Sequence, residues 1–165
     1  MREGGIMRRM IISVSAAVGV LLSIVSPALA RGGGWQADTA EPFDRVLCGA
    51  TMHFEFPVVR TYARVYTRDG ESVFVENGSL VDTITDLDNG RSVTVNNSGT
   101  VTFDITTETL DAHGEVVDML TPQGAERNHL PELFVASGRL RATFDGDGPL
   151  LTIHGRIRDL CAELA

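Results

Sequence analysis

Positive charge is scarce in this 165-residue chain. Lysine is absent, so all 14 basic residues are arginines, and 22 acidic residues give a formal net charge of −8. Nucleic acids and anionic lipid surfaces bind proteins through clustered positive charge. The composition therefore predicts no nucleic-acid partner and no membrane partner for the mature chain.

The common catalytic motifs are also missing. The sequence has no Gly-x-Ser-x-Gly nucleophile motif and no phosphate-binding glycine-rich loop between a strand and a helix. It has no cysteine in a reactive context either. No cofactor is expected on these grounds, and the motifs identify no catalytic residue.

The first 30 residues have the three parts of a secretory signal peptide. These are a basic start, an apolar core and small residues at the cleavage point: Arg2, Arg8 and Arg9, residues 10–25, then Ala28 and Ala30. The pattern predicts cleavage between Ala30 and Arg31 and a secreted, extracellular product. Retention as a membrane anchor is the alternative, which Pro27 and the glycines at 32–34 disfavour.

Cysteine is limited to Cys48 and Cys161. Both would enter an oxidising compartment, where a pair of cysteines forms a disulfide by default. The bond would link the start of the folded region to its end, and closing a loop of about 100 residues contributes up to about 4.7 kcal/mol. A metal or redox pair is the alternative, but the spacing is not Cys-x-x-Cys and no clustered histidine completes a ligand set.

Beyond the signal peptide we expect a flexible leader at residues 31–44 and one β domain at 45–165. Large apolar residues alternate with polar ones at 52–56 and 101–105, which is the period of a strand with one buried face. Further extended runs lie at residues 62–67, 72–76, 80–85, 92–96, 115–120, 133–137, 139–144 and 150–156.

Turn chemistry separates these runs. Clusters of Asp, Asn and Gly that favour tight reversals lie at residues 68–71, 87–90, 97–99, 111–114 and 145–148. Short strands joined by tight turns predict an all-β antiparallel meander, closed as a β-barrel or folded as a two-layer sandwich. The longest connection, residues 121–130, is typical of a loop suited to a ligand or partner, and residues 158–164 predict a short helical turn.

The two cysteines suggest how a barrel would close. If Cys48 and Cys161 face each other across antiparallel neighbours, Glu55 faces His154 and His53 faces Arg156. The first and last strands would then pair. A single bulge would break this register, so the sandwich stays open as an alternative.

Two groups of side chains are candidate sites. His53, Glu55 and His154 would form an acid–base or metal cluster if the polar strand faces lined a lumen; otherwise they are exposed cross-strand pairs. Carboxylates in two turns would suit a hard cation such as calcium, namely Asp86, Asp88, Asp145 and Asp147. The alternative for these four residues is ordinary hairpin-turn chemistry.

Several segments together resemble a family of small secreted actinobacterial proteins of unknown function. They are Cys48-Gly49 with the alternating strand that follows, the turn at residues 66–70, the hairpin at 85–92, the strand start at 98–101 and the end at 159–162. The resemblance implies a secreted, disulfide-closed β domain. It carries no catalytic residues.

These observations lead to two hypotheses from different classes. The first is a secreted, non-enzymatic binding module for a protein, a glycan or a small apolar ligand, contacted by the loops and above all by residues 121–130. The second is a small β-barrel enzyme of cyclase or isomerase type with a polar lumen. They differ in whether His53 and His154 face an enclosed cavity or bulk water.

Overall fold

A computed structural model describes residues 34–165. The predicted signal peptide at residues 1–30 lies outside the described residues. The described elements are β1 (Gln36–Ala37), β2 (Phe43–Leu47), β3 (Ala50–Arg68), β4 (Glu71–Asp86), β5 (Ser92–Asp104), β6 (Thr109–Met119), α2 (Pro122–Asn128), β7 (Leu133–Asp145), β8 (Gly148–Asp159) and α3 (Leu160–Leu164). The predicted short helix at the end of the chain is confirmed as α3.

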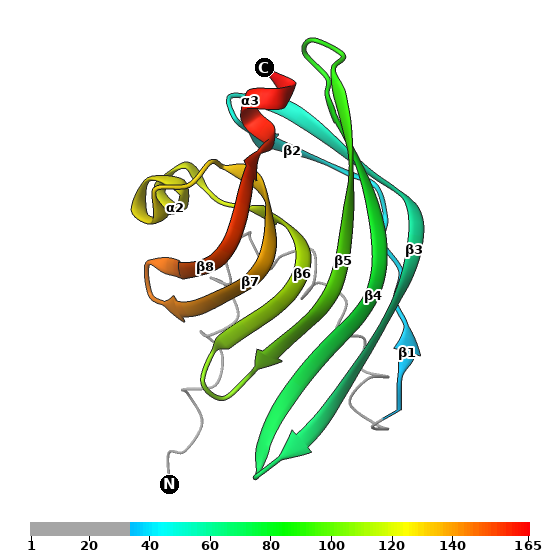
Figure 1. Cartoon of the computed structure of the whole chain (residues 1–165), viewed down its shortest axis with the longest axis vertical. Helices are drawn as coiled ribbons and strands as arrows, with labels where there is room; N and C mark the ends of the chain where they lie inside the picture. Colours follow the sequence, from blue (N-terminus) through cyan, green and yellow to red (C-terminus); the bar gives the residue numbers. More distant parts are fainter. Residues whose placement is uncertain (1–33) are drawn as a thin grey trace, which may run out of the picture.

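The strands form one antiparallel sheet of eight strands in the order β1-β3-β4-β5-β6-β7-β8, with β2 also paired to β3. The all-β antiparallel meander is therefore confirmed. The predicted closure into a barrel is not confirmed, because the sheet stays open (Figure 1). All eight strands belong to one sheet, so the two-layer sandwich does not form either.

The N-terminal segment explains why the sheet does not close. One edge of β3 pairs with β4, and the other is occupied by β1 at Tyr62 and Ala63 and by β2 from Ala50 to Phe54. β2 takes the place opposite His53, and β8 pairs with β7 and not with β3, so the predicted pairing of Glu55 with His154 and of His53 with Arg156 is wrong. Among the described strands, β8 pairs with β7 alone.

The predicted flexible leader at residues 31–44 is corrected in its described part. Gln36 and Ala37 pair with β3, Asp38 N donates to Thr61 O at 2.9 Å, and β2 begins at Phe43. The ring of Trp35 lies 4.5 Å from the Arg64 guanidinium. The segment is therefore an integral part of the sheet edge.

The disulfide between Cys48 and Cys161 is confirmed, but the two cysteines do not lie on paired strands. Cys48 and Gly49 form the two-residue turn between β2 and β3, both with positive φ, and Cys161 lies in α3. The bond therefore ties the β2–β3 turn to the short helix that follows β8. No helix in the described range has the length and apolar character needed to cross a membrane.

A row of glycines crosses the sheet from β4 to β8. In register, Gly78 faces Gly99, Gly99 faces Gly114, Gly114 faces Gly138 and Gly138 faces Gly155. All five have φ between 122° and 157°, which side-chain-bearing residues rarely adopt. A Cβ at any of them would lie 1.9–2.4 Å from a carbonyl oxygen of the neighbouring strand. The strands of the sheet are curved, most strongly β6, β7 and β8 (Figure 1).

This row corrects two predicted turns. Residues 97–99 lie inside β5 and residues 111–114 inside β6, because Gly99 and Gly114 serve the bend and not a chain reversal. The chain reverses instead at residues 105–108. The other three predicted turns, at 68–71, 87–90 and 145–148, join consecutive strands as expected, the first through Asp69 and Gly70 with positive φ at both.

The predicted loop at residues 121–130 is wrong, since its centre is helix α2. Thr121 caps the helix by accepting a hydrogen bond from Gly124 N at 3.0 Å, and Pro122 occupies the first turn. His129 ends it in the left-handed conformation. The cap and the proline are present in the sequence, but a seven-residue helix shows too little periodicity to be recognised.

Two apolar clusters lie on opposite faces of the sheet at β7. Leu133 and Val135 pack with residues of β2–β5 and α3, whereas Phe134 and Ala136 pack in a cluster with α2. Successive strand residues point to opposite faces, so this half of β7 is buried on both sides. The first cluster forms the upper wall of the cavity described below.

The glycine row provides a test of the bend. We expect Gly99→Ala to destabilise the protein by about 3 kcal/mol or more, because the new Cβ would lie 1.9 Å from His113 O at a φ of 154°. Urea unfolding measures the loss. Gly146→Ala is the matched control, since a Cβ at that position would have no atom within 4 Å. Equal urea midpoints for the two variants would show that a side chain at residue 99 is accommodated at little cost, and would contradict the role of the glycine row.

Candidate functional site

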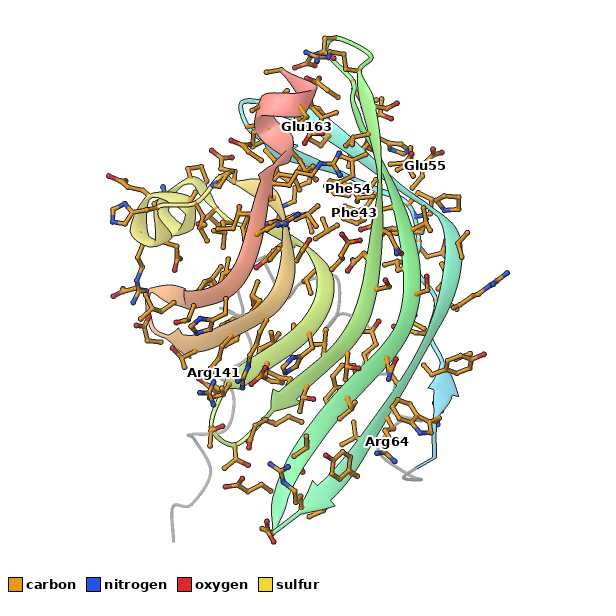
Figure 2. The ribbon with its side chains drawn as sticks, in the orientation of Figure 1. Phe43, Phe54, Glu55, Arg64, Arg141 and Glu163 are labelled. Carbon is orange, nitrogen blue, oxygen red and sulfur yellow. A yellow bond between two sulfur atoms is a disulfide. The ribbon has the colours of Figure 1, made fainter. Side chains whose placement is uncertain are left out.

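The inner face of the sheet holds a cavity of about 90 Å³ lined by residues of β2–β6. Phe43, Phe54, Phe56 and Met119 supply much of its apolar wall. The rings of Phe43 and Phe54 stack with centroids 4.6 Å apart, and Phe56 lies 6.0 Å from Phe43. Figure 2 shows Phe43 and Phe54 on the inner side of the sheet.

A bulge in β3 shapes this wall. The register of β3 against β4 shifts by one residue between Glu55 and Val58, next to Pro57, which has no N–H to donate to a ladder. The shift changes which residues face inward, from Met52 and Phe54 before the bulge to Thr61 and Ala63 after it. Thr61 thereby lines the cavity.

Two carboxyl groups from β4 face the cavity. Glu76 is 7% exposed and Asp82 2% exposed, and Gly78 of the glycine row lies between them on the same strand face. Glu76 Oε2 and Asp82 Oδ1 are buried without a hydrogen-bond partner. A buried polar atom without a partner is uncommon in native proteins and costs stability, so these two oxygens mark the site.

The other oxygen of Asp82 is held in place. Asn97 Nδ2 donates to Asp82 Oδ2 at 3.2 Å, and Asn97 Oδ1 accepts from Val117 N at 3.4 Å. The amide of Asn97 is thus oriented by β6 and fixes the carboxyl of Asp82 across the cavity wall. Oδ1 of Asp82 has no hydrogen-bond partner.

Burial keeps both carboxyl groups partly protonated near neutral pH. It raises the pKa of Glu76 to about 7, with a smaller contribution from the charge of Asp38. It raises the pKa of Asp82 to about 6, against the opposing effect of the hydrogen bond from Asn97. Of the described residues that line the cavity, none is basic.

Another buried carboxyl group, that of Asp118, lines a separate, smaller cavity of about 40 Å³. Burial raises the pKa of Asp118 to about 7, while its hydrogen bond from Met119 N at 2.8 Å and the charge of Arg45 oppose the rise. Asp118 therefore resembles Glu76 and Asp82 in burial, but not in surroundings.

The predicted histidine cluster is assembled only in part: His53 Nε2 lies 3.8 Å from Glu55 Oε1, but His154 lies apart from both on β8. His154 and Glu55 are exposed, and His53 is half-buried on the outer face, so none of them faces the cavity. His53 Nδ1 lies 2.5 Å from Asp44 Oδ1, a contact that raises the pKa of the histidine. His154 faces Arg139 on β7, far along the sheet from β3. These side chains form exposed cross-strand pairs.

The candidate calcium ligands are engaged in turn chemistry. Asp86 accepts from Asp88 N at 2.8 Å and from Asn89 Nδ2 at 2.9 Å, while Asp88 itself is exposed. Within residues 34–165, no group of three or more His, Cys, Asp or Glu side chains is arranged to hold a metal ion.

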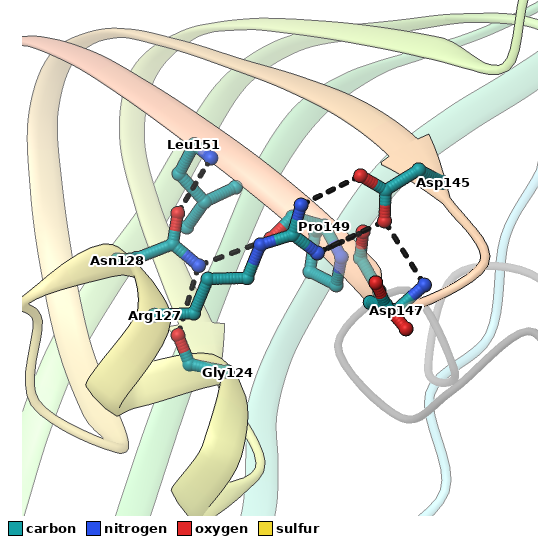
Figure 3. A network of polar contacts seen from close by, with 8 residues as sticks. Gly124, Arg127, Asn128, Asp145, Asp147, Pro149 and Leu151 are labelled. Atoms are coloured by element: carbon teal, nitrogen blue, oxygen red, sulfur yellow. Dashed lines mark hydrogen bonds and ion pairs between the residues drawn. The ribbon is translucent and has the colours of Figure 1, made fainter.

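The second acidic turn is tied to α2 by an ion pair. The Arg127 guanidinium donates to both oxygens of Asp145, at 2.9 and 2.6 Å, and holds the pKa of that carboxyl at about 2 (Figure 3). Asp145 also accepts from Asp147 N at 3.0 Å. Asn128 adds bonds to Pro149 O and Leu151 N, so the polar groups of α2 dock the helix on the β7–β8 hairpin.

The sequence holds a signal for the acidic pair that periodicity alone does not reveal. Phe74, Glu76, Leu80, Asp82 and Ile84 share one strand face, and an acid within an apolar face marks a buried carboxyl group. The runs at 72–76 and 80–85 look like separate strands because Gly78 falls between them, and that break hides the common face.

In comparisons with known proteins, no family model matches the chain, and no curated protein and no solved structure matches it. The resemblance to secreted actinobacterial proteins therefore stays a prediction. The cavity and its two carboxyl groups are the features that bear on function.

Those carboxyl groups make stability depend on pH. Between pH 4.5 and about 7 the folded chain holds a proton on Glu76 that the unfolded chain releases, so the free energy of unfolding falls as pH rises. We expect Glu76→Gln to stabilise the protein at pH 8 by on the order of 3 kcal/mol and to change it little at pH 4. Urea unfolding at both values measures this.

Glu126→Gln, on the exposed side of α2, is the matched control and should shift stability little at either pH. A Glu76→Gln variant that is destabilised at pH 8 would contradict the assignment of Glu76 as an uncompensated buried acid.

Proposed function

We propose that this protein is a secreted binding module whose inner-face cavity holds a small, mainly apolar ligand that carries a hydrogen-bond donor. The observation that carries this proposal is the pair of unpartnered oxygens, Glu76 Oε2 and Asp82 Oδ1, on residues that line a cavity with an aromatic wall. A donor on a ligand that reaches one of these oxygens would recover part of the free energy that its burial costs.

The size of the cavity favours a small molecule over a protein or a glycan. An engineered apolar cavity of about 150 Å³ admits benzene. A cavity of about 90 Å³ suits a ligand of a few heavy atoms, or one end of a longer molecule. Residues 121–130 are a weaker candidate for contacting a protein or glycan than their sequence suggests. The side chains of Arg127 and Asn128 already form hydrogen bonds to the β7–β8 hairpin.

The proposal of secretion rests on the signal-peptide pattern and on the disulfide. A disulfide between Cys48 and Cys161 is compatible with an oxidising compartment outside the cytoplasm. The resemblance to secreted actinobacterial proteins points in the same direction.

One observation favours a second function, a small enzyme of cyclase or isomerase type. Carboxyl groups with pKa values of about 7 and 6 in an apolar cavity are suited to general acid–base catalysis near neutral pH. In such an enzyme Glu76 and Asp82 take the place that the sequence assigns to His53, Glu55 and His154.

NMR titration with a library of small fragments tests the binding function. We expect fragments with an apolar body and one donor to shift the amide signals of Thr61, Gly78 and Gly99, which line the cavity. Leu80→Phe adds volume to the cavity wall and should abolish the shifts, whereas Leu87→Phe, in the exposed β4–β5 turn, should leave them unchanged.

Dispersed amide spectra check that both variants fold. Shifts that gather elsewhere, or no shift with any fragment, would contradict the binding function. New signals from a converted fragment would establish the enzyme.

Export is tested by intact mass on protein recovered from culture supernatant. We expect a chain that begins at Arg31, two hydrogens lighter than its reduced form, that gains two alkyl groups only after reduction. A membrane-bound product that retains residues 1–30 would support the anchor alternative and overturn secretion.

A further inference from the structure

We infer that the ligand is an unbranched alkyl chain with an uncharged head, whose head lies in the cavity beside Glu76 and whose tail continues into the smaller cavity beside Asp118. The inference rests on the proposed function and adds the shape and length of the ligand to it. It follows from the register of the strands, which places both cavities on one face of the sheet.

The register makes the two cavities neighbours. Glu76 of β4, which lines the first cavity, pairs with Val101 of β5. Val101 pairs with Ala112 of β6, which pairs in turn with Leu140 of β7. Residues paired in register point to the same face of a sheet, with Cβ atoms about 5 Å apart. Val101 lines both cavities, while Ala112 and Leu140 line the smaller one, so the row leads from one cavity to the other along a single face.

Three valines border both cavities. Val101, Val116 and Val117 are part of the lining of each, and all three are half-buried. Apolar side chains in a packed wall are buried, as Ile84 and Leu133 are at 0% exposure. Apolar surface that stays accessible in a hollow is typical of a ligand site. An alkyl chain that lies over these valines would cover it.

The smaller cavity suits only an unbranched chain. Its volume is about 40 Å³, whereas a cavity of about 150 Å³ is needed to admit benzene. Ala112 and Ala142 create this space, because they are buried among the larger side chains of Leu110, Leu140 and Leu151. A ring or a branched body is too wide for it.

The polarity of the two cavities gives the chain a direction. The polar residues of the first cavity are Thr61, Glu76, Asp82, Asn97, Thr100 and Glu115. The smaller cavity is apolar except for Asp118, whose Oδ1 already accepts a hydrogen bond from Met119 N at 2.8 Å. The head therefore belongs in the first cavity and the tail in the smaller one.

The acids of the first cavity exclude an anionic head. Glu76, Asp82 and Glu115 line it, and none of its described lining residues is basic. A carboxylate head would therefore be buried next to like charges without a counter-charge. A hydroxyl group carries no charge and both donates and accepts hydrogen bonds, so it suits carboxyl groups in either protonation state.

The test compares 1-butanol with 1-octanol, which differ only in chain length, by NMR titration of the full-length mature protein at pH 8. Each methylene group that leaves water strengthens binding by up to about fourfold, so we expect 1-octanol to bind at least about tenfold more tightly. Both alcohols should shift the amide signal of Gly78, and 1-octanol alone those of Ala112 and Leu140. Octanoate should bind more weakly than 1-octanol.

Two variants of β8 separate the smaller cavity from the surface of the strand. Leu151 lines that cavity, whereas Leu150 is 48% exposed and lines neither cavity. Leu151→Phe should lower the affinity for 1-octanol at least about tenfold and leave 1-butanol binding unchanged, which also shows that the variant folds. Leu150→Phe is the matched control and should leave both affinities unchanged.

Each outcome separates the inference from the function it rests on. Equal binding of the two alcohols, or tighter binding of 1-octanol without shifts at Ala112 and Leu140, would overturn the extended chain while leaving the binding cavity in place. An effect of chain length that survives Leu151→Phe, or is lost in Leu150→Phe, would overturn the assignment of the tail to the smaller cavity. Octanoate that binds as tightly as 1-octanol would overturn the uncharged head. No binding of any of these probes, or of any fragment, would overturn the binding function as well.

Discussion

The close approach of neighbouring strands along the glycine row is the constraint on which this structure depends. At Gly99 and Gly155 a carbonyl oxygen of the adjacent strand occupies the space that a Cβ would need. The row runs through five strands in register, so the bend is shared by the whole sheet and does not belong to one strand. The cavity lies against this bend, with Gly78 and Gly99 in its wall and the two acids of β4 on either side of Gly78.

The two ends of the chain stabilise the bent sheet in different ways. β1 and β2 occupy the edge of β3 that a barrel would need, while the disulfide links the β2–β3 turn to α3 and brings Leu160 and Leu164 into the core. α2 covers the opposite face of β6–β8, where the strands curve most. The open sheet thus buries both faces of β7 near Leu133 and Phe134 without a second sheet, and it leaves Glu76 and Asp82 on the wall of a cavity.

The fold is predictable from the sequence where its determinants are local. The alternation at Met52 and Phe54, the Asp69-Gly70 turn and the cysteine pair all act within a few residues or through covalent chemistry. Prediction fails at Gly99 and Gly114. A glycine that follows serine or histidine is typical of a turn, but here it lies inside a strand whose backbone closely approaches the adjacent strand. The sheet stays open because β1 and β2 pair with β3, and no local pattern predicts which segment pairs there. Glu76 and Asp82 share a face because β4 continues through Gly78, which a local pattern interprets as a break.

An open sheet has two edges, and within the described structure β8 forms one of them. Exposed edges promote association with another chain, and charged residues on them oppose it. Arg156 and Arg158 are exposed on this strand, and Arg158 is held by Glu163 of α3 at 2.6 Å. The charge that Arg156 carries on this open edge therefore acts against edge-to-edge association with another chain.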